Sequence, residues 1–340
     1  MSPRPPQVSQ LHDPITVDWM SARSALSDRV SHRLAHASVR ALLAARRANA
    51  ADQGANIIAI GIGEKISDGE RTGTLAVKVL VAAKVDRREL SRRDLIPASI
   101  DGMPTDVDAV GRARRFAGPN LARVRPVVGG LSISPSYAVA QGTRMAGTLG
   151  LIVHDRAGRR HVLSNNHVLA MENALGIGAE IVQPGTADAI GSANTIATLS
   201  HVEPLLFGNL PNRIDAAAAR LATGVKASRR VAGIGTPTGT AKATINAHVR
   251  KAGRSTGVTE GIVRVVNADV MNVEYVGGVV RINDVIVIEG VGTPFSAEGD
   301  SGSAVIEQRG RVVGLMFGGT DTQTFAVPIA RVLSRFRMSL

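Results

Sequence analysis

The chain has 340 residues, of which 44% are hydrophobic, so it has enough apolar material for a substantial core and is not a disordered protein. It contains no cysteine, which argues against a disulfide-stabilised secreted protein and favours a cytoplasmic one. The net charge is +12, but the arginines are dispersed and only 3% of the residues are aromatic, so nucleic-acid binding is the weaker reading of that charge. No apolar run approaches the roughly 20 residues of a membrane span, and no membrane partner is expected.

The first third of the chain predicts a small folded module. Residues 1–20 are rich in Pro, Ser and Gln and lack hydrophobic periodicity, which predicts a flexible tail. The pattern then predicts, in chain order, a helix over residues 21–49, a β-hairpin with strands over 56–63 and 75–83, a short helix over 87–95 and a third strand over 103–110. Residues 21–115 are therefore predicted to form an α+β module whose N-terminal helix covers a sheet.

The rest of the chain predicts a second, larger domain. Residues 112–125 are basic and contain Gly and Pro, which is typical of a linker. From Pro126 onward, short apolar runs alternate with Gly, Pro, Asp and Asn, and this rhythm is typical of a β-sandwich or barrel. We expect a mainly β domain over residues 126–340.

One stretch of this domain, Ala297–Ser303, predicts chemistry. Its sequence is AEGDSGS, in which two glycines flank an acid and the hydroxyl of Ser301. A serine is a nucleophile only when a base activates it, and the base needs an acid to orient it. His167 ends an apolar run upstream, and Asp215 enters another apolar run between the two. Each residue has an ordinary explanation as well, in a hairpin turn, a satisfied histidine or a helix cap, but the three together favour a catalytic triad.

The chain order His167, Asp215, Ser301 is that of the chymotrypsin type. Three blocks, Ser164–Leu169, Lys251–Gly257 and Gly299–Ser303, resemble the trypsin-like serine proteases of the chymotrypsin fold. Block Lys251–Gly257 is similar to a hairpin of bacterial enzymes such as alpha-lytic protease and the streptogrisins. The strand order of the N-terminal module resembles the region before the protease in plant narrow-leaf-type proteases. The resemblance implies a chymotrypsin-like double β-barrel preceded by the small α+β module.

The same resemblance implies an oxyanion hole and a structural ion pair. The backbone N–H groups of Gly299 and Ser301 would bind the developing oxyanion. Asp300 should be buried beside them, and a buried carboxylate needs a cation. In the bacterial relatives an arginine at the start of the equivalent hairpin has this role, and Lys251 stands at the matching position, with Arg250 as the alternative if the register differs by one.

The substrate pocket is harder to read from the sequence. The resemblance implies a primary pocket without a carboxylate at its base, and hence small or medium apolar side chains as substrates; the residues expected to line it are Ser296, Glu298, Met316, Gly318 and Gly319. Phe317 stands where relatives usually place a serine whose hydroxyl contacts the triad acid. An inactive scaffold that binds peptides or partner proteins in the same groove is therefore the alternative to a serine endopeptidase.

Few other partners are expected. No His/Cys spacing suggests a metal site, and no cofactor is expected. The substrate would be a protein or peptide. The helix and the exposed strand edges of the module suggest that copies of the chain assemble into a homo-oligomer.

Overall fold

The computed structural model describes residues 19–27, 56–67, 69–86, 88–90, 95–111, 122–137, 144–189, 194–208 and 210–340. The predicted tail up to residue 18, most of the predicted helix over 21–49 and linker residues 112–121 lie outside the described residues. Residues 19 and 20, which were expected to belong to the tail, are helical together with 21–27, and Trp19 packs in one apolar cluster with Ala22 and Leu26. Residues 88–90 form turns rather than the predicted short helix.

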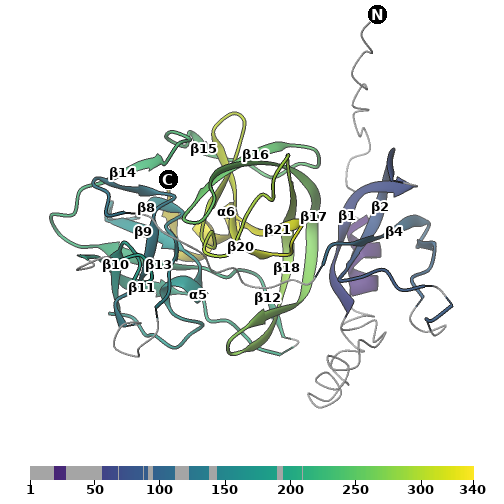
Figure 1. Cartoon of the computed structure of the whole chain (residues 1–340), viewed down its shortest axis with the longest axis horizontal. Helices are drawn as coiled ribbons and strands as arrows, with labels where there is room; N and C mark the ends of the chain where they lie inside the picture. The colour runs from purple at the N-terminus through teal and green to yellow at the C-terminus, as the bar shows by residue number, and fades with distance from the viewer. Residues whose placement is uncertain are drawn as a thin grey trace, which may run out of the picture.

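The N-terminal module is a small sheet with a helix on one face (Figure 1). Its strands are β1 (Ile57–Ser67), β2 (Glu70–Val81), β3 (Ser99–Ile100) and β4 (Met103–Ala109). β1 and β2 form the predicted antiparallel hairpin, while β4 lies parallel to β2. Apolar side chains of the hairpin such as Ile60 and Val77 pack with Trp19 and Leu26 of the helix, so the helix covers the sheet as the sequence predicts.

The second part of the chain begins with a closed barrel. Its strands are β6 (Ser132–Pro135), β7 (Gly147–Thr148), β8 (Leu151–Asp155), β9 (Arg160–Ser164), β10 (Glu180–Gln183), β11 (Asn194–Val202) and β13 (Ala217–Leu221). The pairing order is β8-β9-β13-β11-β10-β6-β7, and β7 runs on almost directly into β8, so the sheet closes on itself. Buried Leu149, Val162, Ile181, Ile196 and Leu199 fill one apolar cluster within it. β5 (Val127–Gly129) and β14 (Ala227–Val231) pair beside this barrel, and β22 (Met338–Ser339) pairs with β8.

A second barrel follows. Its strands are β16 (His248–Gly253), β17 (Gly257–Tyr275), β18 (Gly278–Gly290), β19 (Ala304–Glu307), β20 (Arg311–Gly319) and β21 (Gln323–Pro328). The order β18-β21-β20-β19-β16-β17, with a further pairing of β17 to β18, closes this ring as well. Short strands β12 (Pro211–Asn212) and β15 (Gly239–Thr240) add to β18 and β20, and α6 (Ile329–Phe336) follows β21. The predicted mainly β fold with two barrels is confirmed.

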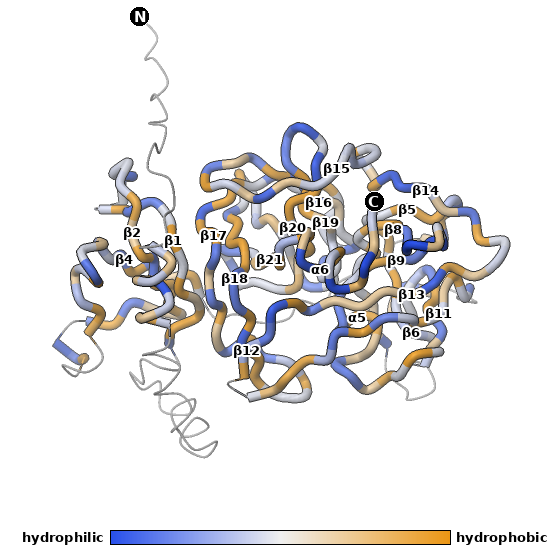
Figure 2. The backbone as a smooth tube through the Cα atoms, turned by 180° about the vertical axis from the view of Figure 1, so that it is seen from behind, coloured by the Kyte–Doolittle hydropathy of each residue, from blue (hydrophilic) through white to orange (hydrophobic). Residues whose placement is uncertain are grey.

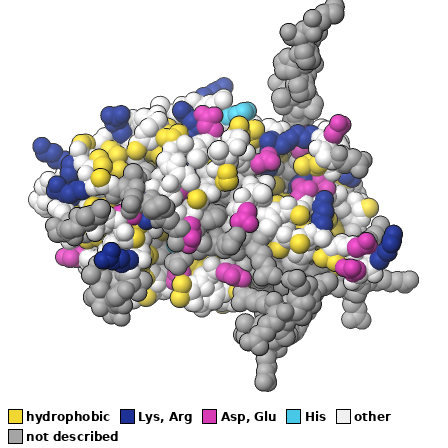
Figure 3. Space-filling model, viewed as in Figure 1, with side chains coloured by type: hydrophobic (Ala, Val, Ile, Leu, Met, Phe, Trp, Pro, Cys, Tyr) yellow, Lys and Arg dark blue, Asp and Glu magenta, His cyan; other side chains and the backbone are white. Residues whose placement is uncertain are grey.

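Hydropathy follows this architecture. Figure 2 shows hydrophobic stretches along the strands of the second barrel and hydrophilic ones at many of the connecting loops. On the face drawn in Figure 3, basic and acidic side chains are interspersed and do not form one basic patch. Within the described ranges, no helix combines the length and the hydrophobicity that crossing a membrane requires.

The module and the second barrel share one sheet. β1 pairs antiparallel with β17, with Ala59 opposite Val270 and Gly63 opposite Val265. The two strands approach closely at Gly61, where a Cβ atom would lie 2.3 Å from Cγ1 of Val265. In Figure 1 the long strands β17 and β18 stand between the module and the rest of the barrel. The module is thus an extension of the barrel wall, a point that the sequence did not predict.

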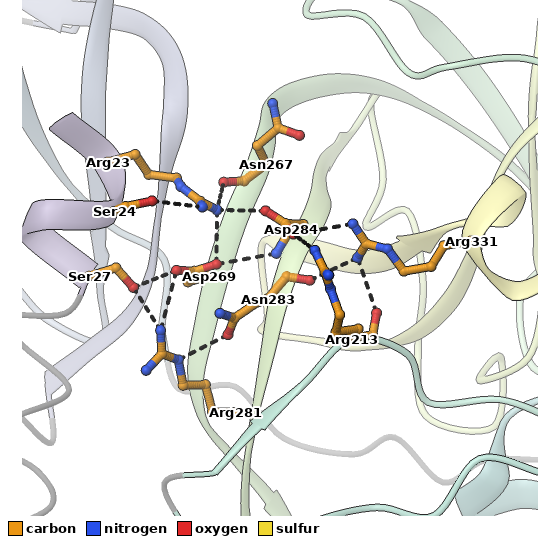
Figure 4. A network of polar contacts seen from close by, with 10 residues as sticks. All are labelled: Arg23, Ser24, Ser27, Arg213, Asn267, Asp269, Arg281, Asn283, Asp284 and Arg331. Carbon is orange, nitrogen blue, oxygen red and sulfur yellow. Dashed lines mark hydrogen bonds and ion pairs between the residues drawn. The ribbon is translucent and has the colours of Figure 1, made fainter. Parts of the chain in front are cut away.

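A charge network that is buried around Arg23 and Asp269 also joins the two parts (Figure 4). Arg23 of the N-terminal helix lies 2.9 Å from the carboxylates of both Asp269 on β17 and Asp284 on β18. Ser27 of the same helix donates a hydrogen bond of 2.5 Å to Asp269. Asp284 in turn pairs with Arg213 and with Arg331 of α6, at 2.9 Å and 3.2 Å. The helix therefore contributes a charged contact to β17 and β18, besides its apolar contacts to the module.

Candidate active site

The predicted base and acid lie together between the two barrels. His167 belongs to the short helix α5 (Asn166–Leu169), which begins two residues after β9 ends. Asp215 lies two residues before β13, the neighbour of β9 in the first barrel. His167 Nδ1 and Asp215 Oδ2 are 2.5 Å apart, and the two residues are 2% and 0% exposed. This is the contact by which an acid fixes the tautomer and orientation of a catalytic histidine.

Asp215 is held by several further donors. The backbone N–H groups of Asn166 and His167 donate to Oδ1 at 2.7 and 3.2 Å. The hydroxyl of Tyr275, at the end of β17, donates to Oδ2 at 2.8 Å. Phe317 was expected to replace a hydroxyl near the acid, but no sequence pattern indicates Tyr275, which is 60 positions from Asp215 along the chain. The chain has only two tyrosines, but this scarcity does not indicate that one of them contacts the acid.

Ser301 lies on a tight loop between β18 and β19 of the second barrel, and hydrogen bonds tie this loop to both barrels. The Ser301 carbonyl accepts a hydrogen bond of 2.8 Å from Thr148 N in the first barrel, and Gly302 N donates 2.9 Å to Met316 O in the second. The Ser301 hydroxyl donates to the carbonyl of Phe317 at 3.3 Å. Nε2 of His167 is buried and has no hydrogen-bond partner among the described residues. The histidine is thus bonded to its acid, while the serine hydroxyl is directed to the backbone.

The expected oxyanion donors are on the same loop. The N–H groups of Asp300 and Ser303 donate to carbonyls of the loop itself, and that of Gly302 donates to Met316 O on β20, whereas no backbone acceptor among the described residues takes the N–H of Gly299 or Ser301. Gly299 has φ of +91°, and a Cβ atom there would lie 2.4 Å from both Arg254 Nη1 and Ser255 Oγ. Only glycine fits this backbone conformation and this close approach.

Asp300 is fully buried and has a cation beside it. Lys251 Nζ lies 2.8 Å from Asp300 Oδ2, and both side chains are 0% exposed. The carboxylate also accepts from the Thr256 hydroxyl at 2.6 Å and from the backbone N–H groups of Ser255 and Ala297 at 2.8 and 3.0 Å. Burial lowers the pKa of Lys251, and the charge of Asp300 opposes that shift. The contact is made by Lys251 and not by its neighbour Arg250.

The hairpin that carries Lys251 makes a second buried ion pair. Arg254 binds Asp188 of the first barrel with two nitrogens, each 2.6 Å from a carboxylate oxygen. Its backbone N–H donates to Thr148 Oγ1 at 2.9 Å, and that hydroxyl donates to Gly299 O at 2.8 Å. The hairpin therefore holds the Gly299–Ser303 loop through Asp300 and through Thr148. No motif in the sequence indicates Asp188.

The residues expected to line the pocket lie in strand β20 and in the loop before Ser301. Ser296 is 5% exposed and its hydroxyl is 2.6 Å from that of Thr324 on β21. Met316 is 0% exposed and belongs to an apolar cluster of the second barrel. Gly318 and Gly319 are buried at the end of β20, and the carbonyl of Glu298 accepts a hydrogen bond from Ser255 Oγ. In the described ranges, no group of three acidic or histidine side chains is arranged to hold a metal ion.

Comparisons with known proteins bear on the barrels. The family model described as Nal1 C-terminal domain matches residues 219–327, about a third of the chain. Thermobifida fusca protease A is 20% identical, over 63% of this chain and 97% of its own, with a TM-score of 0.45. Cellulomonas bogoriensis chymotrypsin is 19% identical over 63% and 97%, with a TM-score of 0.44. The Nocardiopsis protease is 17% identical over 63% and 98%, with a TM-score of 0.45. No curated protein sequence matches the chain.

Proposed function

We propose that the chain is a serine endopeptidase with His167, Asp215 and Ser301 as its triad. The observation that carries this proposal is the buried Asp215–His167 pair, in which Nδ1 is bonded to the acid and Nε2 has no partner among the described residues. A buried, unpaired imidazole nitrogen is costly, and catalysis supplies a reason to keep it. It is the nitrogen that a general base offers to a serine.

The mechanism follows from these positions. The Ser301 hydroxyl would leave the Phe317 carbonyl by rotating about its Cα–Cβ bond and donate to His167 Nε2. As Oγ bonds to the scissile carbonyl carbon, its proton passes to Nε2, and Asp215 stabilises the imidazolium. The oxyanion would be bound by the N–H groups of Gly299 and Ser301. The proton then goes to the leaving amine as the C–N bond breaks. In the second half of the reaction, water gives a proton to His167, attacks the acyl carbon and releases the Ser301 hydroxyl.

For specificity we propose small or medium apolar side chains. Support comes from Ser296 and Thr324, whose hydroxyls bond to each other, and from buried Met316. Cleavage of a peptide library should show a preference for such residues on the N-terminal side of the cut bond. A profile dominated by Lys or Arg would contradict this pocket.

An inactive peptide-binding scaffold is the second candidate, and one observation favours it. The Ser301 hydroxyl bonds to the Phe317 carbonyl and not to His167. If the hydroxyl keeps this hydrogen bond when a peptide is bound, Ser301 is not activated, and the protein would bind peptides without cleaving them. The two candidates differ in one measurable property, the reactivity of the serine.

A fluorophosphonate probe tests that reactivity. We expect the full-length chain to be labelled, and labelling to be lost in both Ser301→Ala and His167→Ala, because the probe reacts only with an activated serine. Exposed Ser334→Ala and His248→Ala are matched controls and should label like the wild type. Absence of labelling in the folded wild type would favour the scaffold, and labelling that survives in Ser301→Ala would place the reactive serine elsewhere.

We also propose a relationship to the plant narrow-leaf-type proteases. It is supported by the match of residues 219–327 to the Nal1 C-terminal domain and by the strand order of the module. By this resemblance we propose that copies of the chain assemble.

A further inference from the structure

We propose that Tyr275 is a positioning residue for the catalytic acid Asp215. This role rests on the proposed function, and no sequence motif indicates it. The hydroxyl of Tyr275 donates to Asp215 Oδ2, the oxygen that also faces His167 Nδ1. The two donors therefore share one oxygen, at 2.8 Å and 2.5 Å respectively. A displacement of Tyr275 would therefore change the hydrogen bonding of the Asp215 oxygen that orients His167.

The ring of Tyr275 adds a second constraint. It stands edge to face against the imidazole of His167, with centroids 5.5 Å apart and planes at 76°. The preferred geometry of aromatic pairs has this form. Tyr275 thus contacts both members of the acid–base pair, one through its hydroxyl and the other through its ring.

The position of Tyr275 is itself fixed by the tip of the β17–β18 hairpin. Gly277 N, two residues on, donates 2.8 Å to a carboxylate oxygen of Glu172, which follows the helix of His167. Gly208 N, seven residues before Asp215, donates 2.8 Å to Val279 O. Phe207 lies so close to Gly277 that a Cβ atom there would be 2.8 Å from its ring. The tip is therefore tied to the segment after His167 and to the segment before Asp215.

The hydroxyl matters because Asp215 is 0% exposed. A buried carboxylate oxygen must find its hydrogen bonds within the protein, and bonds to a charged group are stronger than those between neutral groups. Phe317, which follows the nucleophile on β20 and was expected to lack the hydroxyl that would support the acid, packs its ring on Phe325 in the core. Tyr275 supplies the missing donor from a different strand.

Tyr275→Phe tests this role, because it removes the hydroxyl and keeps the ring. We expect fluorophosphonate labelling to slow by about tenfold or more, the scale of one lost hydrogen bond to a charged group, at a temperature where the variant is still folded. We also expect the downfield proton resonance of His167 Nδ1–H to move further downfield, since Oδ2 would then serve one donor only. Tyr137→Phe, which removes the chain's other tyrosine hydroxyl from a residue that is 47% exposed, should change neither quantity.

The outcomes separate this inference from the proposed function. If the wild type is not labelled but the resonance moves in Tyr275→Phe, the protease assignment fails while the contact of Tyr275 with the acid stands. If the wild type is labelled and Tyr275→Phe matches it in both rate and resonance, Tyr275 has no positioning role. A fall in labelling with an unchanged resonance would likewise overturn the inference, because the acid–histidine contact would then be independent of the hydroxyl.

Discussion

Lys251→Ala is expected to abolish most of the reactivity of Ser301 while both barrels stay folded. The substitution leaves the carboxylate of Asp300 buried without its cation, and breaking a buried ion pair in this way typically costs ~3–5 kcal/mol. In this variant we expect the Asp300 side chain to move toward solvent. This movement would displace the neighbouring N–H groups of Gly299 and Ser301 from the positions in which they bind the oxyanion. Loss of such donors slows acyl transfer on the order of 10²–10³-fold. Fluorophosphonate labelling rates and urea unfolding measure the two effects separately.

Two variants identify the cause. Arg250→Ala removes the neighbouring cation, which does not contact Asp300, and should label like the wild type. Lys251→Met with Asp300→Asn removes both charges, so the double variant should regain much of the stability that Lys251→Ala loses. If Lys251→Ala alone were fully labelled, the ion pair would not hold the loop.

A short motif with a fixed spacing predicted the ion pair next to Ser301. The Lys251–Gly257 block matched a known hairpin, and its register placed a cation opposite Asp300, where the structure has Lys251. The alternation of apolar runs and turn residues likewise predicted the β architecture. Both features are determined by residues that are close together in the sequence, so a short stretch of sequence is enough to predict them.

Contacts between distant segments were not predictable in this way. Tyr275 contacts Asp215 from the last position of β17, a strand of 19 residues that begins at Gly257. Arg254 and Asp188 are 66 positions apart, and neither stands in a motif that names the other. The pairing of β1 with β17 depends on the absence of a side chain at Gly61, which a sequence pattern does not connect with Val265. Such contacts depend on how strands are arranged in space.

The N-terminal helix provides the second large effect that we expect. Arg23→Ala should lower the free energy of unfolding by about 3 kcal/mol, because its guanidinium is nearly buried between Asp269 and Asp284 and both carboxylates remain. Arg335 is the matched control, since it pairs with Glu203 at 2.5 Å but its side chain is 59% exposed. An exposed pair contributes less than about 1 kcal/mol, so Arg335→Ala should be nearly neutral.

The pH dependence of this loss has a defined sign. Burial of Asp284 opposes its ionisation, but Arg213, Arg23 and Arg331 outweigh burial, and the pKa of Asp284 lies below its ordinary value. A carboxyl whose pKa is lowered by folding stabilises the fold above the pKa of the unfolded chain, and this contribution disappears as the pH falls through the folded pKa. The difference in stability between wild type and Arg23→Ala should therefore be full at pH 7 and shrink below about pH 4. A difference that stayed constant with pH would mean that Arg23 acts through packing and not through its charge.

Arg23→Ala should also lower the reactivity of the candidate active site. Asp284 pairs with Arg213, which stands two residues before Asp215, and Arg331 donates 3.2 Å to the carbonyl of Arg213. When Arg23 is lost, these groups rearrange around Asp284, and the segment that carries the acid is less firmly held. We expect fluorophosphonate labelling of Arg23→Ala to fall severalfold at a temperature where the variant is still folded, while Arg335→Ala keeps the wild-type rate. Unchanged labelling of Arg23→Ala, together with the expected loss of stability, would show that the helix supports the fold without reaching the triad.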